Sequence, residues 1–214
     1  AAAGLIEEVV DVVYQILGGL KGGLATATII AATILAAMVG VIGAAEVTMG
    51  IVALPAMLKR KYNPVMACGS ILAGGTLGIL IPPSILAIIF AVVAQQSVGE
   101  LFIGAFFPGF LLSGMYILYV TGLSYIKDGY GPALPKEERI SVKQKLILLK
   151  GIIAPILLVC LVLGVIFTGV ATPVEAAGIG TFGALVVAAL SRKLSWTNIS
   201  TAAITTLKAS TMVL

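Results

Sequence analysis

Histidine is absent from this chain of 214 residues, cysteine occurs twice, and charged side chains are scarce. Because the two cysteines, Cys68 and Cys160, each lie inside an apolar run, we expect no histidine- and cysteine-ligated metal site. Two cysteines are also too few for a disulfide-stapled domain. The 13 basic residues are scattered over loops, so the clustered basic face of a nucleic-acid-binding protein is missing and no nucleic-acid partner is expected.

The residues that are plentiful are apolar. Hydrophobic residues make up 60% of the chain and charged residues 10%, whereas soluble domains average about 45–50% and about 25%. So few charges cannot cover the surface of a soluble protein of this size, and so apolar a chain cannot be disordered. The composition therefore predicts an all-α, polytopic membrane protein embedded in the lipid bilayer. The chain begins with Ala1, without a signal peptide, and stops in a segment that is becoming apolar, so we expect a piece of a longer membrane protein.

Residues 1–23 form the first predicted unit. Residues 5–17 place polar side chains near one helical face and apolar ones on the other, which is typical of an interfacial or packed amphipathic helix. The glycine-rich link 18–23 ends that helix. The segment is too short and too polar to span a membrane.

Residues 24–94 contain two interrupted apolar segments. In the first, the arms Leu24–Val39 and Val47–Leu58 fall short of the roughly 20 residues that span the hydrocarbon. Two short arms around a glycine-rich tip favour a re-entrant helical hairpin over two full spans. In the second, Pro64–Ala94, adjacent prolines at Pro82 and Pro83 remove donors and clash with the preceding turn. This pattern predicts a discontinuous transmembrane helix broken near mid-membrane.

The rest of the chain reads more conventionally. Residues 95–145 are predicted to hold one transmembrane helix and a cytoplasmic loop, and residues 146–214 two further spans and the start of an amphipathic segment. The predicted elements are Leu101–Ile126, Leu146–Thr168, Pro173–Leu190 and a segment from Thr197 onward.

The cationic loops agree with this topology. Lys21, Lys59-Arg60-Lys61, Lys127–Lys145 and Arg192-Lys193 all fall on one predicted side, whereas Gln95–Glu100 and the segment before Pro173 carry no cation. Since cytoplasmic loops are enriched in Lys and Arg, that side is predicted to be cytoplasmic. The count of sides is the same for a hairpin and for two short spans, so it does not distinguish them.

The two interruptions are where we place the candidate site. Irregular backbone at membrane depth is tolerated only where it is buried in protein or lines a cavity, and freed carbonyls there can bind Na⁺. For any single glycine, close helix packing is the alternative explanation. The candidate sodium- and substrate-binding residues, with Na⁺ held through main-chain oxygens of the same segments, are Gly40, Gly43, Ala44, Glu46, Gly75, Thr76, Gly78, Pro82, Pro83 and Ser84.

Two acids need separate treatment. Glu46 is the only acid of the hairpin, where it can neutralise a cation or carry a proton, or else reach the interface or pair with a structural cation. Glu175 follows Pro173 at the start of a predicted helix, where an acid complements the helix dipole, so we expect it to cap that helix.

The run Gly74-Gly75-Thr76-Leu77-Gly78-Ile79-Leu80-Ile81-Pro82-Pro83-Ser84 resembles the signature of the large membrane (M) subunit of tripartite ATP-independent periplasmic (TRAP) transporters, the DctM-like subunits. Thr168-Gly169-Val170-Ala171-Thr172-Pro173-Val174-Glu175-Ala176-Ala177 is similarly typical, and the resemblance runs along essentially the whole chain. One departure is Ala44-Ala45-Glu46, where many relatives have small or hydroxyl residues.

The resemblance implies the permease subunit of a Na⁺-driven symporter in a bacterial inner membrane, which imports an organic acid such as a dicarboxylate. It implies a small membrane (Q) subunit and a periplasmic substrate-binding protein (P subunit) as partners, and an elevator-type fold of which this chain holds part. Residues 146–214 would then begin a second, inverted half. Na⁺ is the coupling ion, and no other cofactor is implied.

Other functions stay open at this stage. Another ion-coupled elevator carrier without a binding protein fits the same interruptions. An intramembrane enzyme or a structural subunit is a different class, but Ser84 or Ser70 would need a base to become a nucleophile, and the chain has no histidine. We therefore expect a transporter and not an enzyme.

Overall fold

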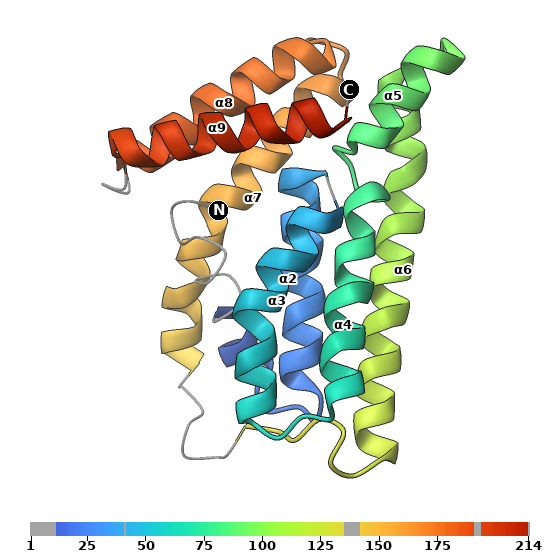
Figure 1. Cartoon of the computed structure of the whole chain (residues 1–214), viewed down its shortest axis with the longest axis vertical. Helices are drawn as coiled ribbons and strands as arrows, with labels where there is room; N and C mark the ends of the chain where they lie inside the picture. The colour runs from blue at the N-terminus through green and yellow to red at the C-terminus, as the bar shows by residue number, and fades with distance from the viewer. Residues whose placement is uncertain (1–11, 41, 135–141, 191–193, 214) are drawn as a thin grey trace.

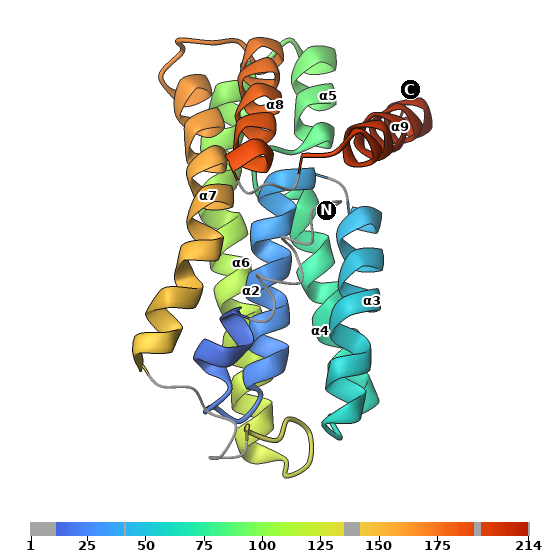
Figure 2. The same ribbon diagram turned by 90° about the vertical axis from the view of Figure 1, so that its left-hand side faces the viewer.

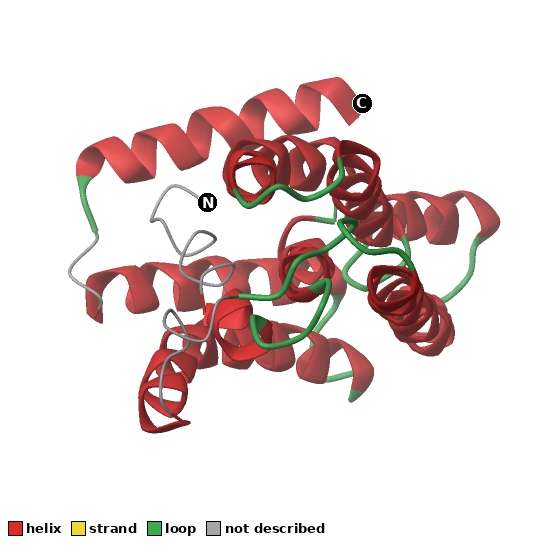
Figure 3. Cartoon of the chain, turned by 90° about the horizontal axis from the view of Figure 1, so that it is seen from below, coloured by secondary structure: helices red, strands yellow, loops and turns green. Residues whose placement is uncertain are grey.

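The computed structural model describes residues 12–40, 42–134, 142–190 and 194–213. These residues form helices joined by short loops, and no strand occurs among them (Figure 3). The all-α prediction is therefore confirmed for the described part of the chain.

The helices follow one another as the sequence predicts, with small shifts at their ends. Pro173–Leu190 agrees with its predicted bounds, and the other long helices begin or end within a few residues of theirs. In chain order (Figure 1) they are α2 Gly23–Val39, α3 Ile42–Lys59, α4 Pro64–Thr76, the 3₁₀ helix η1 Leu77–Ile79, α5 Ile85–Ala94, α6 Val98–Ile126, α7 Val142–Phe167, α8 Pro173–Leu190 and α9 Trp196–Val213.

The amphipathic segment at the start of the chain packs against the protein where it is described. Residues 12–17 are helical, and Val12, Val13 and Tyr14 are buried. Of the two alternatives for this segment, packing holds for these residues; the remainder of the predicted helix, residues 5–11, lies outside the described residues.

Helix α2 is the centre of the bundle. It contacts α3, α4 and α6, and its side chains from Leu24 to Leu35 are almost all buried. Four of them are alanines with no exposed surface: Ala25, Ala27, Ala31 and Ala32. Small residues let helix backbones approach closely. The approach is tightest at Gly74 of α4, where a Cβ would lie 2.6 Å from the Cβ of Ala32.

Hydroxyl pairs join α2 to α6. The hydroxyl oxygens of Thr26 and Thr121 are 3.1 Å apart, and those of Thr33 and Ser113 are 3.0 Å apart. Both threonines on α2 are buried. Because a buried hydroxyl without a partner is costly, these two pairs fix α6 against α2 along much of its length.

Two helices are long and apolar enough to cross a membrane within the described ranges, judged by length and composition: Val98–Ile126 and Pro173–Leu190. Shorter apolar helices are Gly23–Leu35, Pro64–Ile79, Ile85–Ala94 and Ile156–Phe167. In the most apolar window of α6 only 17% of the residues are buried. Apolar side chains such as Phe107, which is 72% exposed, therefore face outward, as they do in proteins that contact lipid or a partner.

The cationic loops meet at one end of the bundle, the lower end in Figure 1. The ammonium of Lys21 lies 2.9 Å from a carboxylate oxygen of Asp128, and the N–H of Asn63 donates to the carbonyl of Tyr130 at 3.3 Å. These contacts confirm that the loops around residues 21, 59–61 and 127 share one end.

Helix α8 departs from the simplest crossing pattern. Figure 1 shows α8 and α9 at the other end, at a steep angle to the long helices, so α8 does not return along them to the cationic end. The segment with Arg192 and Lys193, predicted to share the cationic side, lies outside the described residues.

The start of α8 is a capping box. The backbone N–H and the hydroxyl of Thr172 each donate to Oε2 of Glu175 at 2.8 Å, and the N–H of Glu175 points back to the Thr172 hydroxyl at 3.4 Å. This reciprocal pair satisfies donors that the first helical turn leaves free. The prediction that Glu175 caps its helix is confirmed.

Candidate functional site

The first interruption is shorter than the sequence predicts. Helix α2 ends at Val39 and α3 begins at Ile42, so the described connection narrows to Gly40, which has a φ of +66°. A positive φ is the left-handed conformation that glycine adopts without penalty, and it ends α2.

The second arm therefore begins at Ile42 rather than at Val47, and the predicted boundary is wrong. Gly43, Ala44 and Glu46 lie inside α3. The physical reason is that Ala and Glu favour helix, whereas one glycine costs only about 1 kcal/mol there. Carbonyls inside a helix accept from its own N–H groups. The carbonyls of Gly43 and Ala44 are therefore not free, whereas the sequence predicts that they are. What this first turn leaves free is its N–H groups.

The second interruption lies where the prolines predict it. Helix α4 tightens into η1, the N–H groups of Leu80 and Ile81 both donate to the carbonyl of Leu77 at 3.1 and 2.8 Å, and the helix then stops. Pro82 and Pro83, joined by a cis peptide bond, have no N–H with which to continue it. Helix α5 starts afresh at Ile85, with Ser84 as its N-cap. The predicted break in the helix is confirmed.

The two interruptions touch each other. A Cβ placed on Gly40 would lie 2.6 Å from the carbonyl oxygen of Pro83 and 3.4 Å from the backbone nitrogen of Ile85. Figures 1 and 2 both show the α2–α3 connection beside the α4–α5 connection, near the end opposite the cationic loops. We call this meeting point, Gly40 with Leu80–Ser84, the junction.

The junction is enclosed by neighbouring helices. η1 contacts α2, α3, α5 and α6. On the α6 side, a Cβ on Gly109 would lie 2.8 Å from a side-chain carbon of Ile81. Ile81, Pro82 and Ser84 are buried. The break therefore lies inside protein.

Oxygen atoms without donors collect at the junction. Among the described residues, no backbone N–H is found to donate to the carbonyls of Pro82 or Pro83. Pro82 is buried and Pro83 is half-buried. Because a buried carbonyl is normally paired, that of Pro82 needs a water, a cation or another donor. The Ser84 hydroxyl is 1% exposed and accepts from the N–H of Ala87 at 3.4 Å, which leaves a further lone pair. These oxygens suit a hard cation such as Na⁺.

Two helix N-termini also begin at the junction. Helix α3 starts at Ile42, directly after the Gly40 connection, and α5 starts at Ile85 against Gly40. Helix N-termini present free N–H groups and a partial positive charge, so they favour anions. The same place thus offers oxygens for a cation and N–H groups for a carboxylate.

The remaining predicted site residues lie one to two helical turns away. Gly75, at the end of α4, lies against the Cγ of half-buried Glu46, so α3 and α4 meet there. Gly78 is buried in η1. Thr76 is exposed, and its hydroxyl donates to the carbonyl of Ala73 in its own helix at 2.8 Å. No cation lies within 4 Å of the Glu46 carboxylate among the described residues.

Sequence reasoning missed two residues that hold this arrangement. Gly109, on α6, leaves room for the side chain of Ile81. The only local sign of this role in the sequence is its neighbour Pro108. Tyr62 is 3% exposed at the cationic end, and its hydroxyl accepts from the N–H of Leu24 at 3.1 Å, which caps the start of α2. Burial raises the pKa of the Tyr62 hydroxyl; the hydrogen bond from Leu24 and the charge of Arg60 oppose that rise.

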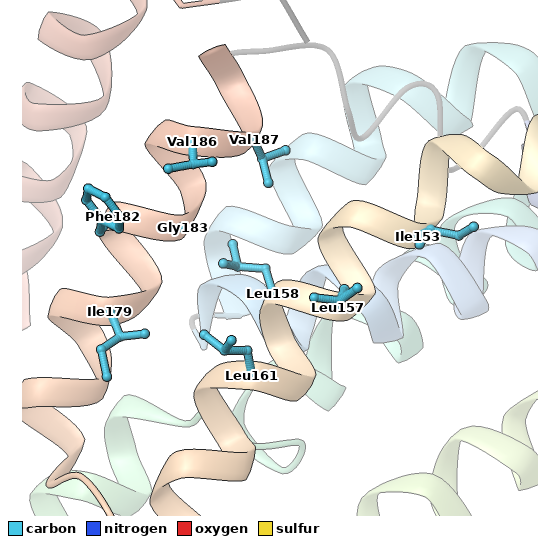
Figure 4. Close-up of a pocket in the computed structure, with 9 residues that line it drawn as sticks. All are labelled: Ile153, Leu157, Leu158, Leu161, Ile179, Phe182, Gly183, Val186 and Val187. Carbon is cyan, nitrogen blue, oxygen red and sulfur yellow. The ribbon is translucent and has the colours of Figure 1, made fainter. Parts of the chain in front are cut away.

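A cavity lies away from the junction, between α7 and α8. Its volume is about 570 Å³ and every side chain that lines it is apolar (Figure 4). Gly183 lets α8 approach α7 closely beside it, since a Cβ there would lie 2.5 Å from a methyl carbon of Leu158. Without a polar group it has no means of binding an ion or a carboxylate, so the junction is the better candidate site.

Comparison with known proteins identifies a family that matches the whole chain and relatives that cover most of it. The family described as "Tripartite ATP-independent periplasmic transporter, DctM component" matches residues 1–214. A C4-dicarboxylate TRAP transporter large permease protein DctM of Vibrio cholerae is 34% identical over 179 residues, which are 84% of this chain and 38% of that protein.

Two further relatives carry other names. An isethionate TRAP transporter permease protein DctMQ of Oleidesulfovibrio alaskensis is 31% identical over 187 residues, 87% of this chain and 29% of that protein. An ectoine TRAP transporter large permease protein TeaC of Halomonas elongata is 29% identical over 168 residues, 78% of this chain and 38% of that protein. The chain thus spans less than half the length of these curated relatives. All three are named permeases, in agreement with the expectation of a transporter and not an enzyme.

Proposed function

The chain belongs to the DctM family of tripartite ATP-independent periplasmic transporter components, and on that premise we propose that it is part of a permease that imports an organic acid together with Na⁺. The permease lies in a bacterial inner membrane and crosses it several times. The α2–α3 pair forms a re-entrant hairpin, and the broken helix α4–η1–α5 lies beside it.

The observation that carries this proposal is the contact between Gly40 and Pro83. It joins two interrupted segments at one buried point, where carbonyl oxygens lack donors and two helices begin. Discontinuous helices of this kind bind coupling ions through unwound carbonyls and anionic substrate groups through half-helix N-termini. The proline carbonyls and the Ser84 hydroxyl hold Na⁺, and the N–H groups at the start of α3 and α5 bind the substrate carboxylate.

The other predicted site residues take supporting roles in this proposal. Gly43 and Ala44 belong to the first turn of α3, so they contribute N–H groups and not carbonyls. Gly75 and Gly78 let α3 and its neighbours approach. Glu46, half-buried one turn into α3, adds negative charge near the junction, where it favours a bound cation over an empty site.

We further propose that α2, α3 and α4 move as one body during transport, in an elevator-type mechanism. Close packing supports this: α2 contacts both partners, and Gly74 of α4 lies against Ala32 of α2. Interfaces of this density resist sliding and favour rigid-body motion. Residues 146–214 then begin a second, inverted half that supplies the other wall of the site.

Partners and substrate follow from the relatives. A small membrane (Q) subunit and a periplasmic binding protein (P subunit) are proposed partners, since one relative is named DctMQ and the family name describes a tripartite periplasmic transporter. The relatives' names include C4-dicarboxylate, isethionate and ectoine transporters. A C4-dicarboxylate or a related carboxylate is the substrate that we propose first.

The test is uptake by proteoliposomes that contain the full-length permease and its small subunit. With the binding protein and a labelled C4-dicarboxylate outside, an inward Na⁺ gradient is expected to drive accumulation. An inward K⁺ gradient of the same size is the control and should give none. Uptake that is indifferent to Na⁺ contradicts the coupling, and Na⁺-driven uptake without any binding protein supports the alternative of an independent carrier.

A further inference from the structure

A second groove lies between α4 and α6, at the cationic end of the bundle. Its volume is about 400 Å³, within the range of about 300–1,000 Å³ typical of ligand pockets. Along α4 it is lined by Val65, Gly69 and Ala73, and along α6 by Tyr116 and Tyr119. A Cβ on Gly69 would have no atom within 4 Å, so the missing side chain leaves open space. Apart from the hydroxyls of Ser70, Tyr116 and Tyr119, the shaft of the groove is apolar, and the Ser70 hydroxyl donates to the carbonyl of Ala67 at 3.0 Å.

Positive charge lies at one end of this groove. Lys127 lies at its mouth, with its ammonium 5.2 Å from the centre of the Tyr130 ring, and both residues line the groove. The neighbouring carboxylate of Asp128 is already paired with Lys21 at 2.9 Å. Among the described residues no carboxylate lies within 4 Å of Lys127. The mouth consequently carries an uncompensated positive charge.

The start of α4 adds to that charge. Val65 and Met66, in the first turn of α4, also line the groove. Pro64 has no N–H and the N–H of Val65 donates to Oδ1 of Asn63 at 2.9 Å, so the helix start contributes through its partial positive charge, which acts together with the ammonium at the same mouth. An anion is the ligand that this end favours.

The sides of the groove are open to the surroundings. Val65 is 76% exposed and Tyr119 is 66% exposed. In a helix bundle that lies in lipid, such a groove opens sideways into the bilayer, and tyrosines at the end of a span mark the level of the headgroups. A ligand must then be apolar along its length and anionic at one end.

We propose that this groove binds one anionic glycerophospholipid of the leaflet that faces the cationic end. One acyl chain lies along Gly69 and Ala73 between α4 and α6, and the phosphate lies at Lys127 and the start of α4. Because α4 carries the break at the junction, the lipid braces this helix against α6. The inference goes beyond transport itself and does not depend on Na⁺ coupling.

The test uses the full-length permease with its small subunit, purified in detergent and titrated with phosphatidylglycerol while lipid retention is followed by native mass spectrometry. Phosphatidylcholine with the same acyl chains is the zwitterionic probe, and glycerol phosphate is the competitor without chains. We expect the protein to retain phosphatidylglycerol in preference to phosphatidylcholine, and glycerol phosphate not to displace it.

Two variants locate the lipid, each with a matched control. Lys127→Ala should weaken retention of phosphatidylglycerol by about fivefold, the effect of one cation at an anionic surface, while Lys61→Ala at the same end leaves it unchanged. Gly69→Leu fills the groove and should abolish retention. Gly122→Leu on α6 is the control and should leave retention unchanged. A Cβ on Gly122 also meets no atom within 4 Å, but Gly122 does not line the groove.

The proposal is overturned by any of four results. Equal retention of the two lipids removes the role of the charge, and displacement by glycerol phosphate shows that a free anion and not a lipid is bound. If Gly69→Leu keeps its lipid, or the assembled wild type retains none because a protein segment covers the groove, the site is not a lipid site. Thermal unfolding of each variant identifies any variant that fails to fold. The comparison of the two lipids on the wild type does not depend on the variants.

Discussion

Gly40 lies against the carbonyl of Pro83, so that a Cβ on Gly40 would come within 2.6 Å of the Pro83 oxygen. No residue with a side chain fits at this position, because Gly40 has a φ of +66° and the neighbouring Pro83 carbonyl is rigid backbone. Two segments more than 40 residues apart in the chain are thereby joined at one point. A small change at Gly40 is expected to disturb both.

Gly40→Ala tests this contact. Alanine in the left-handed conformation costs about 1–2 kcal/mol, and overlap with the Pro83 oxygen adds to that cost. We expect a lower melting temperature of the purified full-length protein and loss of Na⁺-driven uptake. Gly43→Ala is the matched control, since Gly43 lies in α3 and its Cβ would meet no atom within 4 Å; it should be neutral or slightly stabilising. Equal behaviour of the two variants would contradict the account.

Gly75→Ala tests the packing of α3 on α4. A Cβ on Gly75 would overlap the Cγ of Glu46, and overpacking of this kind costs about 1–3 kcal/mol. Shortening the obstructing side chain should relieve it, so Glu46→Ala combined with Gly75→Ala is expected to recover most of the lost stability. The measurement is a double-mutant cycle by thermal unfolding. Strictly additive effects would mean that the two side chains do not meet, and Gly69→Ala on the same helix is the control without a neighbour.

Tyr62→Phe tests the cap on α2. The variant leaves the N–H of Leu24 buried without its acceptor, which costs about 1–3 kcal/mol. The pH dependence has a defined sign. Burial raises the pKa of Tyr62 in the folded state, so its contribution to stability is present below about pH 10, the unfolded value, and is lost as the pH rises through the folded pKa. The stability difference between wild type and Tyr62→Phe should therefore be constant near neutral pH and shrink above pH ~10. A constant difference across that range would show that Tyr62 is not buried.

Thr172→Ala tests the capping box of α8. Loss of an N-cap hydroxyl costs about 0.5–2 kcal/mol, and the first turn of α8 should fray. Hydrogen exchange of the amides of residues 174–178 is expected to speed up. Thr181→Ala, in the same helix, removes a hydroxyl that only returns to the carbonyl of Ala177, and it should leave that exchange unchanged.

The sequence predicts the elements well because their signals are local. Pro82 and Pro83 lack donors wherever they occur, so the break between α4 and α5 needed no tertiary information. The signals for the bounds of Pro173–Leu190 and for the cap that Glu175 makes at its start are equally local. The tip of the first interruption was placed too widely because Gly43 reads as a helix breaker, whereas the structure keeps it in α3.

Contacts between distant segments could not be predicted in this way. Nothing in the spacing of Gly40 and Pro83 says that they touch, since this depends on how α2 packs against α4. Gly75 and Glu46 were both predicted as site residues, but their mutual contact arises only when α3 lies on α4. Tyr62 has no local signal at all, because its role follows from the position of Leu24, 38 residues away in the chain.

The most direct test of the central claim is the Na⁺ concentration that gives half-maximal uptake in proteoliposomes, measured for Ser84→Ala. A hydroxyl bonded to a charged group contributes about 1.5–3 kcal/mol, so this concentration should rise at least about tenfold, whereas Thr76→Val, whose hydroxyl bonds to Ala73 in its own helix, should keep the wild-type value. If Ser84→Ala has the wild-type value, or Thr76→Val shows the larger change, the junction of Gly40 with Leu80–Ser84 is not the Na⁺ site.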